Sequence, residues 1–115
     1  MLGTTFGGNH LACTAALAVL DIIENEHLID NAAKIGEYFR NSFIADKTLK
    51  EYRGKGLMIG MELKDGYVGL RDRLLFERHF FTGAAGAQVI RLLPSLTISQ
   101  ETAESFVNAW KELTL

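Results

Sequence analysis

Hydrophobic positions in the first part of this 115-residue chain recur every three or four residues, the period of an α-helix. The pattern predicts one helix over residues 11–24 and a second over residues 28–43. In the early part of the first helix, apolar residues occupy most of the circumference, so we expect that part to be buried on several sides. Cys13 lies within it, and we interpret it as a small buried hydrophobic residue rather than a nucleophile.

The middle of the chain changes to a period of two residues, which indicates β-strands. The alternation runs over residues 57–63, and the turn signal EYRGKG just before it predicts a hairpin with a partner strand at residues 49–53. We expect a turn at DGYVG, a short helix over residues 68–78, a short strand at HFFT (residues 79–82) and a flexible turn at GAAG.

The C-terminal part combines one more strand with one more helix. In QVIRLLPSL, Arg91 shares a face with Val89 and Leu93, and Pro94 ends the strand. Ser99 is a suitable N-cap for the last helix. The buried stripe of that helix is predicted to be Ala103, Phe106, Val107, Trp110 and Leu113. Short strands and partly segregated helices favour an α+β fold, with a small, mostly antiparallel sheet covered by helices.

Composition narrows the function classes. A length of 115 residues suggests one domain, and a net charge of −2 gives no basic excess for binding nucleic acid or an anionic membrane. No apolar run is long enough for a membrane span, and the N-terminus lacks the basic region of a signal peptide. One cysteine excludes an internal disulfide, and His10, His27 and His79 lack the spacing of metal ligands. We therefore expect a cytoplasmic protein without a metal site.

The loop GTTFGGN at residues 3–9 has the composition of an anion-binding loop. Glycines allow a ligand to approach the backbone, threonine hydroxyls and backbone N–H groups suit a phosphate, and the following helix N-terminus favours an anion. The alternative is a loop that only leads the chain into the helix. The segment matches neither the P-loop pattern nor the dinucleotide-binding pattern.

Three arginine and lysine positions are further candidates for chemistry. Arg53 and Lys55 lie in the glycine turn, where they either bind an anion or are surface residues at the end of a solvent-exposed hairpin. Arg91 stands in an otherwise apolar strand, where it is either a paired or carboxylate-binding residue or a surface arginine. No serine, histidine and aspartate have the spacing of a catalytic triad.

Three stretches, in this order, resemble the C-terminal third of the class III aminotransferases, which are fold-type I enzymes that use pyridoxal phosphate. They are GTTFGGNHLACTAALAVLDII, RGKGLMIGMEL and VIRLLPSLTIS. The likeness covers essentially the whole chain and is greatest to the acetylornithine-type branch. It implies that residues 1–10 are an interface loop from the end of the large domain. Residues 11–115 would then form the small C-terminal domain.

The resemblance implies roles for three residues. Thr5 would bind the cofactor phosphate in the neighbouring subunit of a homodimer, and Thr4 would lie beside the substrate. Arg91, in the R-x-x-P-x-L motif, would bind the α-carboxylate of the amino acid. Arg53 and Gly54 match the structural R-G-x-G turn of the family. His10 departs from the family pattern, which has proline at that position.

The resemblance also implies that this chain holds no catalytic residue. The family's Schiff-base lysine comes earlier in the sequence, and none of the six lysines here has a matching context. We therefore expect a fragment, inactive alone and without bound pyridoxal phosphate. Its parent enzyme would transfer an amino group from N-acetylornithine or N-succinylornithine to 2-oxoglutarate in arginine biosynthesis. The alternatives are an ornithine or 4-aminobutyrate aminotransferase, or a stand-alone module that binds a small anion.

Overall fold

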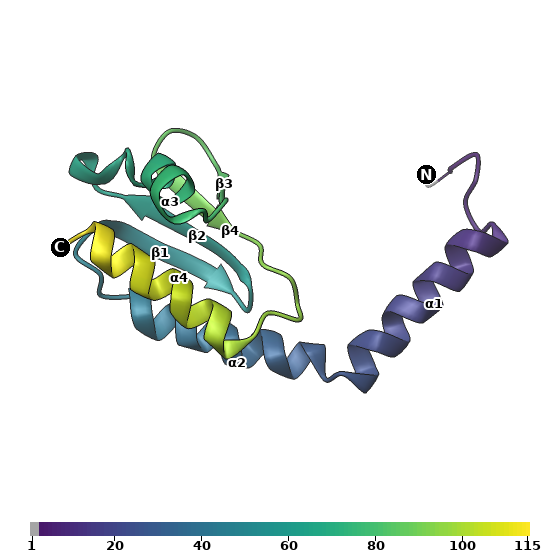
Figure 1. The fold of residues 1–115 in the computed structure, drawn as a ribbon. Coiled ribbons are helices and arrows are strands. Elements are labelled where there is room, and N and C mark those ends of the chain that lie inside the picture. Colours follow the sequence, from purple (N-terminus) through teal and green to yellow (C-terminus); the bar gives the residue numbers. More distant parts are fainter. Residues whose placement is uncertain (1–2) are drawn as a thin grey trace.

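The computed structural model describes residues 3–115 and contains helices on one side of a small sheet (Figure 1). The elements are α1 (His10–Asn25), α2 (Leu28–Phe43), β1 (Leu49–Lys55), β2 (Met58–Leu63), a 3-10 helix η1 (Asp65–Tyr67), α3 (Leu70–Arg78), β3 (Gly83–Ala84), β4 (Val89–Leu92) and α4 (Gln100–Leu113). The predicted helices and the hairpin are confirmed, with shifts of up to two residues at the ends. The DGYVG turn takes the form of η1.

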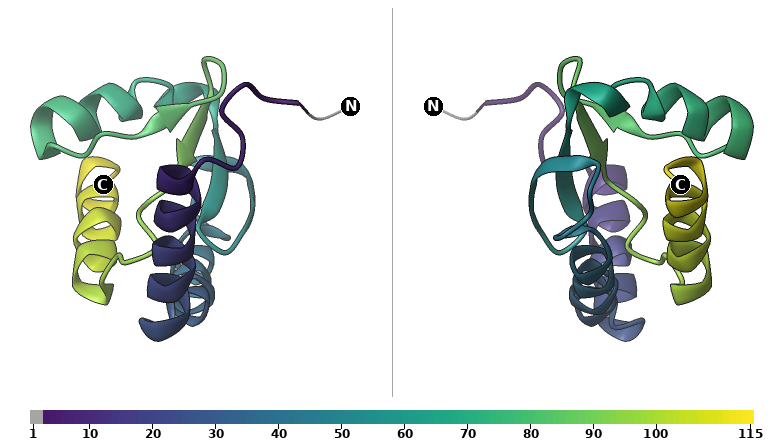
Figure 2. Two further views of the ribbon diagram at one scale, coloured as in Figure 1. Left: turned by 90° about the vertical axis from the view of Figure 1, so that its right-hand side faces the viewer. Right: turned by 90° about the vertical axis from the view of Figure 1, so that its left-hand side faces the viewer.

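The strands form one sheet in the order β1-β2-β4-β3, and every neighbouring pair is antiparallel. Helices α2 and α4 lie against one face of this sheet, while no helix of residues 3–115 covers the other face (Figure 2). The predicted α+β architecture with a small antiparallel sheet is therefore confirmed. The uncovered face is the one that carries Arg91, because Ile90 and Leu92 on either side of it are buried.

The predicted strand at residues 79–82 is wrong. His79 has a φ of 61° and ends α3, and the backbone N–H of Phe80 still bonds to the carbonyl of Leu74 in that helix. The strand begins only at Gly83, within the GAAG segment that we expected to be a turn, and Gly83–Ala84 pair with Arg91 and Ile90. Phenylalanine favours strands, but here the end of α3 overrides that propensity. The backbone N–H of Phe80 is still bonded within α3, so it is not available for pairing in the sheet.

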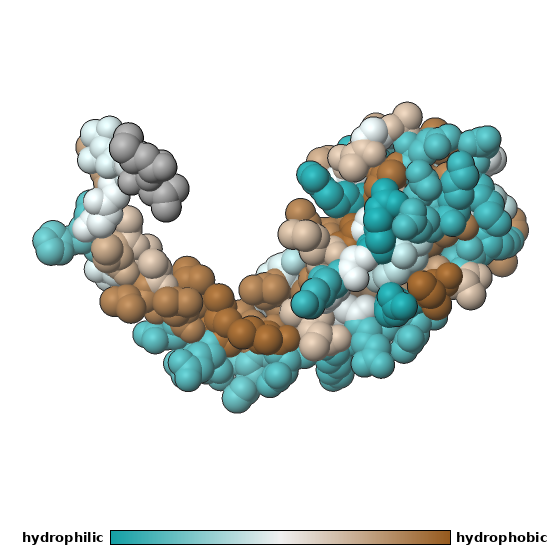
Figure 3. Space-filling model, turned by 180° about the vertical axis from the view of Figure 1, so that it is seen from behind, coloured by the Kyte–Doolittle hydropathy of each residue, from teal (hydrophilic) through white to brown (hydrophobic). Residues whose placement is uncertain are grey.

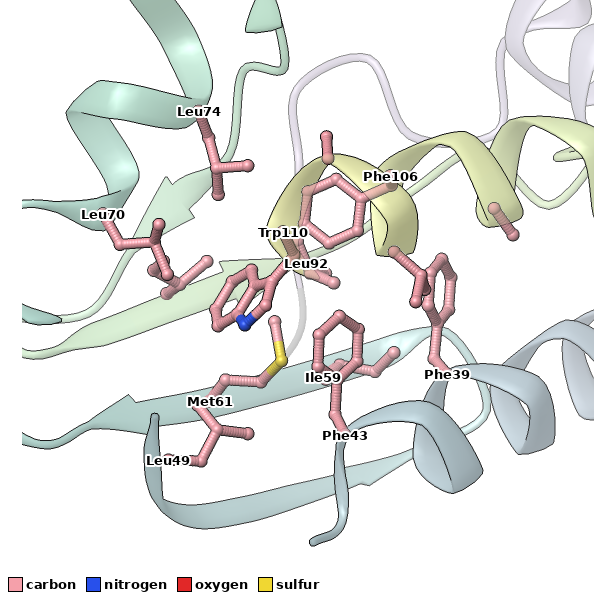
Figure 4. Packing of buried hydrophobic residues seen from close by; sticks show 14 of the residues in the cluster. Phe39, Phe43, Leu49, Ile59, Met61, Leu70, Leu74, Leu92, Phe106 and Trp110 are labelled. Carbon is pink, nitrogen blue, oxygen red and sulfur yellow. The ribbon is translucent and has the colours of Figure 1, made fainter. Parts of the chain in front are cut away.

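An aromatic cluster fills the space between the sheet and helices α2 and α4 (Figure 4). The ring centroids of Phe43 and Trp110 are 5.0 Å apart, and those of Phe80 and Phe106 are 5.3 Å apart, both in edge-on arrangements. The predicted stripe of the last helix is confirmed, since Ala103, Phe106, Val107 and Trp110 are buried and Leu113 is half-buried. Burial of these rings supplies much of the stabilisation of the domain.

Helix α2 packs directly on the backbone of the β1–β2 turn. A Cβ atom on Gly36 would lie 2.4 Å from the carbonyl oxygen of Gly56, so a side chain does not fit there. Gly56 itself has a φ of 56°, a left-handed conformation that glycine adopts without strain. The glycines of the RGKG turn therefore allow a close contact between a helix and a hairpin. This supports a structural role for the turn.

A polar cluster attaches the end of α4 to the loop after α2. The side chain of Asp46 is only 3% exposed, and it accepts hydrogen bonds from Lys111, from the hydroxyl of Thr48 and from the Thr48 backbone N–H. Thr48 in turn accepts a bond from the indole of Trp110. Burial raises the pKa of the Asp46 carboxyl, but the bonds from Lys111 and Thr48 outweigh it and hold the pKa below its ordinary value.

Helix α1 extends away from the rest of the molecule and contacts it mainly through α2 (Figure 1). The prediction that the early part of this helix is buried on several sides is wrong for residues 3–115, because α1 has no buried residue. The interpretation of Cys13 as a buried hydrophobic residue is also wrong there, because Cys13 is exposed. An apolar strip runs along it, including Leu11, Leu17 and Leu20, with exposed fractions of 82%, 63% and 60% (Figure 3). The sequence pattern records apolar character, but nothing within residues 3–115 packs over this surface.

No helix within residues 3–115 is both long enough and apolar enough to cross a membrane.

Candidate functional site

Arg91 lies in the centre of the uncovered sheet face, between two glycines. Its cross-strand partners are Gly60 on β2 and Gly83 on β3, and Gly60 is in turn paired with Arg53 on β1. A Cβ atom on Gly83 would be 3.7 Å from Arg91 Nε, so the arginine side chain lies over this glycine. In the same way, a Cβ atom on Gly60 would be 3.7 Å from Arg53 Nε, so each arginine side chain lies over one glycine of this row.

The two arginines of this row differ in their partners. Arg53 donates to the carboxylate of Glu51 across 2.7 Å, and both side chains are about half exposed. Arg91 is exposed and has neither an ion-pair nor a side-chain hydrogen-bond partner among the described residues. A guanidinium with all of its donors open is suited to bidentate binding of a carboxylate. The surface alternative for Arg53 and Lys55 is thus favoured for Arg53, while Arg91 stays a carboxylate-binding candidate.

A hollow of about 360 Å³ opens beside Arg91, at the edge of the sheet where β4 leads into Pro94. Its walls come from the segment before β3, from the end of β4 and from helices α2 and α4. The lining residues are Phe39, Phe80, Phe81, Thr82, Gly83, Arg91, Leu92, Leu93, Pro94, Ile98, Thr102 and Phe106. Arg91 is the one charged residue in this lining, within the part of the chain that is described. No repeat in the sequence indicates this hollow, because its walls come from segments that are far apart in the chain.

The loop before α1 has its own local order. Asn9 caps α1, since its side-chain oxygen accepts from the backbone N–H of Ala12 across 2.9 Å, and its amide donates to the Phe6 carbonyl. A Cβ atom on Gly7 would lie 2.3 Å from the hydroxyl of Thr4, and Gly8 has a φ of 76°. The glycines thus permit the turn, and Thr4 and Thr5 are both exposed. The loop leads into the helix, and its hydroxyls remain available to a ligand.

The structure does not bring the predicted site residues together in one chain. Thr4 and Thr5 precede the N-terminus of α1, at the far end of that helix from the sheet that carries Arg91 (Figure 1). Figure 1 shows the segment before α1 well apart from the sheet, so the threonines of this chain do not meet a ligand that Arg91 holds.

Comparison with known proteins gives a match over nearly the full chain. The model of the family "Aminotransferase class-III" matches residues 1–113. The acetylornithine aminotransferase of Methanocaldococcus jannaschii is 38% identical over 115 residues, which cover 96% of this chain and 29% of that protein. The ornithine aminotransferase of Bacillus subtilis is 41% identical over 101 residues, which cover 86% of this chain and 25% of that protein.

Solved structures agree with the sequence matches. The acetylornithine aminotransferase from Elizabethkingia anophelis has a TM-score of 0.82 and 30% identity, covering 100% of this chain and 33% of that one. The ornithine aminotransferase from Toxoplasma gondii has a TM-score of 0.78 and 28% identity, covering 96% of this chain and 28% of that one. That enzyme was crystallised with partial occupancy of pyridoxal phosphate at its active site. The chain thus spans between 25% and 33% of the length of these four proteins.

Proposed function

This chain belongs to the class III aminotransferase family, and we propose that it is the substrate-carboxylate and cofactor-phosphate part of an acetylornithine-type enzyme. The proposed reaction transfers the amino group of N-acetylornithine or N-succinylornithine to 2-oxoglutarate, in arginine biosynthesis in the cytoplasm. The observation that carries the proposal is Arg91, an exposed and unpartnered guanidinium on the uncovered sheet face. An amino-acid substrate offers the carboxylate that such a group binds best.

The residues before α1 fit the phosphate of pyridoxal phosphate. Thr4 and Thr5 are exposed beside a helix N-terminus, and a Cβ atom on Gly3 or Gly8 would meet no atom within 4 Å, so a ligand can approach the backbone there. In the proposed enzyme, Thr5 hydrogen-bonds the phosphate and Thr4 lies beside the substrate. When bound, the cofactor supplies the electron sink for the transfer. Arg91 orients the substrate by its carboxylate.

The separation of the loop from Arg91 supports a homodimer in which each loop serves the neighbouring subunit. Because the threonines precede α1 and the arginine lies on β4, one chain cannot place both on one small substrate. Two chains related by a two-fold axis can exchange their loops, as in other isologous interfaces. The 115-residue chain alone is proposed to be inactive, and neither Thr5 nor Arg91 forms a covalent bond in this scheme.

The exposed face of α1 favours this proposal over a stand-alone binding module. A helix that is apolar over most of its circumference is stable in water only when other protein covers it. Leu11, Leu17 and Leu20 are more than half exposed, so α1 is built to lie within a larger assembly. The proposal therefore assigns α1 to an interior position in the complete enzyme.

A hybrid enzyme tests the proposal. Residues 1–113 replace the matching segment of the Methanocaldococcus jannaschii acetylornithine aminotransferase, and glutamate formation from 2-oxoglutarate is measured with N-acetylornithine, N-succinylornithine, ornithine or 4-aminobutyrate as donor. We expect activity with an acylated donor, and Arg91→Gln lowers kcat/KM about 30-fold or more, which corresponds to roughly 2 kcal/mol. Arg53→Gln is the matched control, because an exposed ion pair contributes little.

Two outcomes would contradict the proposal. A hybrid that folds but uses only ornithine or 4-aminobutyrate would move the chain to another branch of the family. A hybrid in which Arg91→Gln and Arg53→Gln have equal kinetics would remove Arg91 from the substrate site. For the 115-residue chain alone, added pyridoxal phosphate is expected to give no stoichiometric absorbance band of a lysine adduct, and such a band would overturn the proposed inactivity.

A further inference from the structure

We propose that a second hollow, beside α3, binds a small α-amino acid as a zwitterion, with its carboxylate on Arg71 and its ammonium group on Asp72. This α3 hollow lies between the first turn of α3 and the loop that joins β3 to β4, and its volume is about 260 Å³. Leu63 and Ile90 line it, and both belong to the sheet face that the helices cover. Arg91 lies on the other face, so the inference rests neither on that residue nor on the proposed function.

Arg71 supplies an open cation at this hollow. The two other arginines of α3, Arg73 and Arg78, form ion pairs with glutamates, whereas Arg71 has no acidic partner within residues 3–115. Its Nε donates to the carbonyl oxygen of Thr82 across 3.2 Å, which holds the half-buried side chain against the segment before β3. The Nη groups have no partner in the described part of the chain. They are therefore the donors that a ligand carboxylate can accept from.

Asp72 supplies an open anion at the same hollow. It lies in the first turn of α3, where a carboxylate interacts favourably with the helix dipole. Within residues 3–115, however, its oxygens accept no hydrogen bond and form no ion pair, whereas Asp46 and Asp65 both accept bonds from side chains. The helix dipole thus accounts for a charge at this position and leaves both oxygens open. An ammonium group, with three donors and no acceptor, is a suitable ligand for them.

The combination of the two charges selects a zwitterion. Arg71 and Asp72 are neighbours in the chain, but they form no ion pair with each other. A simple anion on Arg71 is repelled by Asp72, and a simple cation on Asp72 is repelled by Arg71. An α-amino acid carries a carboxylate and an ammonium group on one carbon atom, so it can pair with both residues at once.

The remaining wall limits the size of the ligand. Val68 is 39% exposed and offers apolar surface, while Ala84, Gly86 and Ala87 bring little side-chain volume into the hollow. A volume of about 260 Å³ is just below the range of pockets that hold drug-sized molecules. We therefore expect an amino acid with a small apolar side chain, such as alanine.

The test measures binding of three probes to the 115-residue chain by ligand-observed NMR at neutral pH. L-Alanine carries both charges, propionate lacks the ammonium group, and L-alaninamide lacks the carboxylate. We expect L-alanine to bind about fivefold more tightly than either of the other two, because each of these loses one partly exposed ion pair. L-Alanine that does not bind, or that binds no more tightly than propionate and L-alaninamide, would overturn the proposal.

Variants assign each charge of the ligand to its residue. Asp72→Asn is expected to remove the preference for L-alanine over propionate, and Arg71→Gln the preference for L-alanine over L-alaninamide. Since Asp72 is exposed and makes no bond within residues 3–115, Asp72→Asn is expected to fold, which far-ultraviolet circular dichroism checks. Arg73→Gln, on the same helix, is the matched control and should leave both preferences unchanged. Preferences that survive in Asp72→Asn and Arg71→Gln would refute the site.

Arg91→Gln separates this inference from the proposed function. The two preferences should persist in this variant, because Arg91 lies on the uncovered face of the sheet. Binding of L-alanine that is lost in Arg91→Gln and kept in Arg71→Gln would place the amino acid at Arg91 and refute the α3 hollow. A failure of the hybrid enzyme, with these preferences intact, would refute only the proposed function.

Discussion

Replacing Gly36 by alanine is expected to destabilise the domain, although alanine is the better helix former. In an exposed helix interior this change stabilises by about 1 kcal/mol. Here the new Cβ would lie 2.4 Å from the carbonyl oxygen and 2.7 Å from the carbonyl carbon of Gly56. Both are backbone atoms, so no side chain can turn away, and α2 and the hairpin must separate by about 1 Å to restore ordinary contact.

The magnitude follows from two opposing contributions. Overpacking a tight contact costs about 1–3 kcal/mol, and a backbone contact belongs at the upper end. After the gain in helix propensity, we expect Gly36→Ala to lower the free energy of unfolding by about 2 kcal/mol. For a domain of this size, that corresponds to a fall in Tm of about 8 °C.

Urea unfolding followed by the fluorescence of Trp110 measures this difference. Trp110 is the only tryptophan of the chain and has no exposed surface, so its emission reports the loss of the core. Asn41→Ala, at an exposed position of the same helix, is the matched control and is expected to stabilise by about 0.5 kcal/mol. If Gly36→Ala is as stable as the wild type or more stable, the close packing of α2 on the RGKG turn is refuted.

Two further predictions concern the Asp46 cluster and α1. Hydrogen bonds hold the pKa of Asp46 below its unfolded value. Its contribution to the free energy of unfolding is therefore complete above about pH 4 and is lost as the pH falls through the folded-state pKa. In urea unfolding, Asp46→Asn should lower the free energy of unfolding by about 1–3 kcal/mol at pH 7 and make it less dependent on pH below 4. Equal pH profiles for the variant and the wild type would contradict this. Asp21→Asn, on the exposed surface of α1, is the control. The exposed apolar strip of α1 should make the chain self-associate, so that its sedimentation coefficient rises with concentration in sedimentation velocity. The double variant Leu17→Lys with Leu20→Lys should abolish this rise. Phe76→Lys, at an exposed position on α3, is the control that should not. A wild type that stays monomeric at every concentration would contradict the prediction.

The periodicity of the sequence determined which segments form helices and which strands form the hairpin. It succeeded for α2 and α4 because one face of each helix carries the residues that the sheet buries. It also identified Arg91 correctly as the odd residue of its strand, since a charge between Ile90 and Leu92 must lie on the opposite face. The period of the apolar residues is thus enough to predict an element when the residues that share one face of it are the buried ones.

The sequence pattern failed wherever position depended on residues far apart in the chain. The strand predicted at residues 79–82 moved to Gly83–Ala84 because the end of α3 and the pairing with β4 decide where the sheet edge begins. The hollow beside Arg91 and the contact of Gly36 with Gly56 have no periodic signal, since each joins segments that meet only in the folded molecule. Helix α1 shows the converse case. Its apolar residues predict a buried helix. The tertiary structure shows that no side chain of α1 is buried by other parts of residues 3–115.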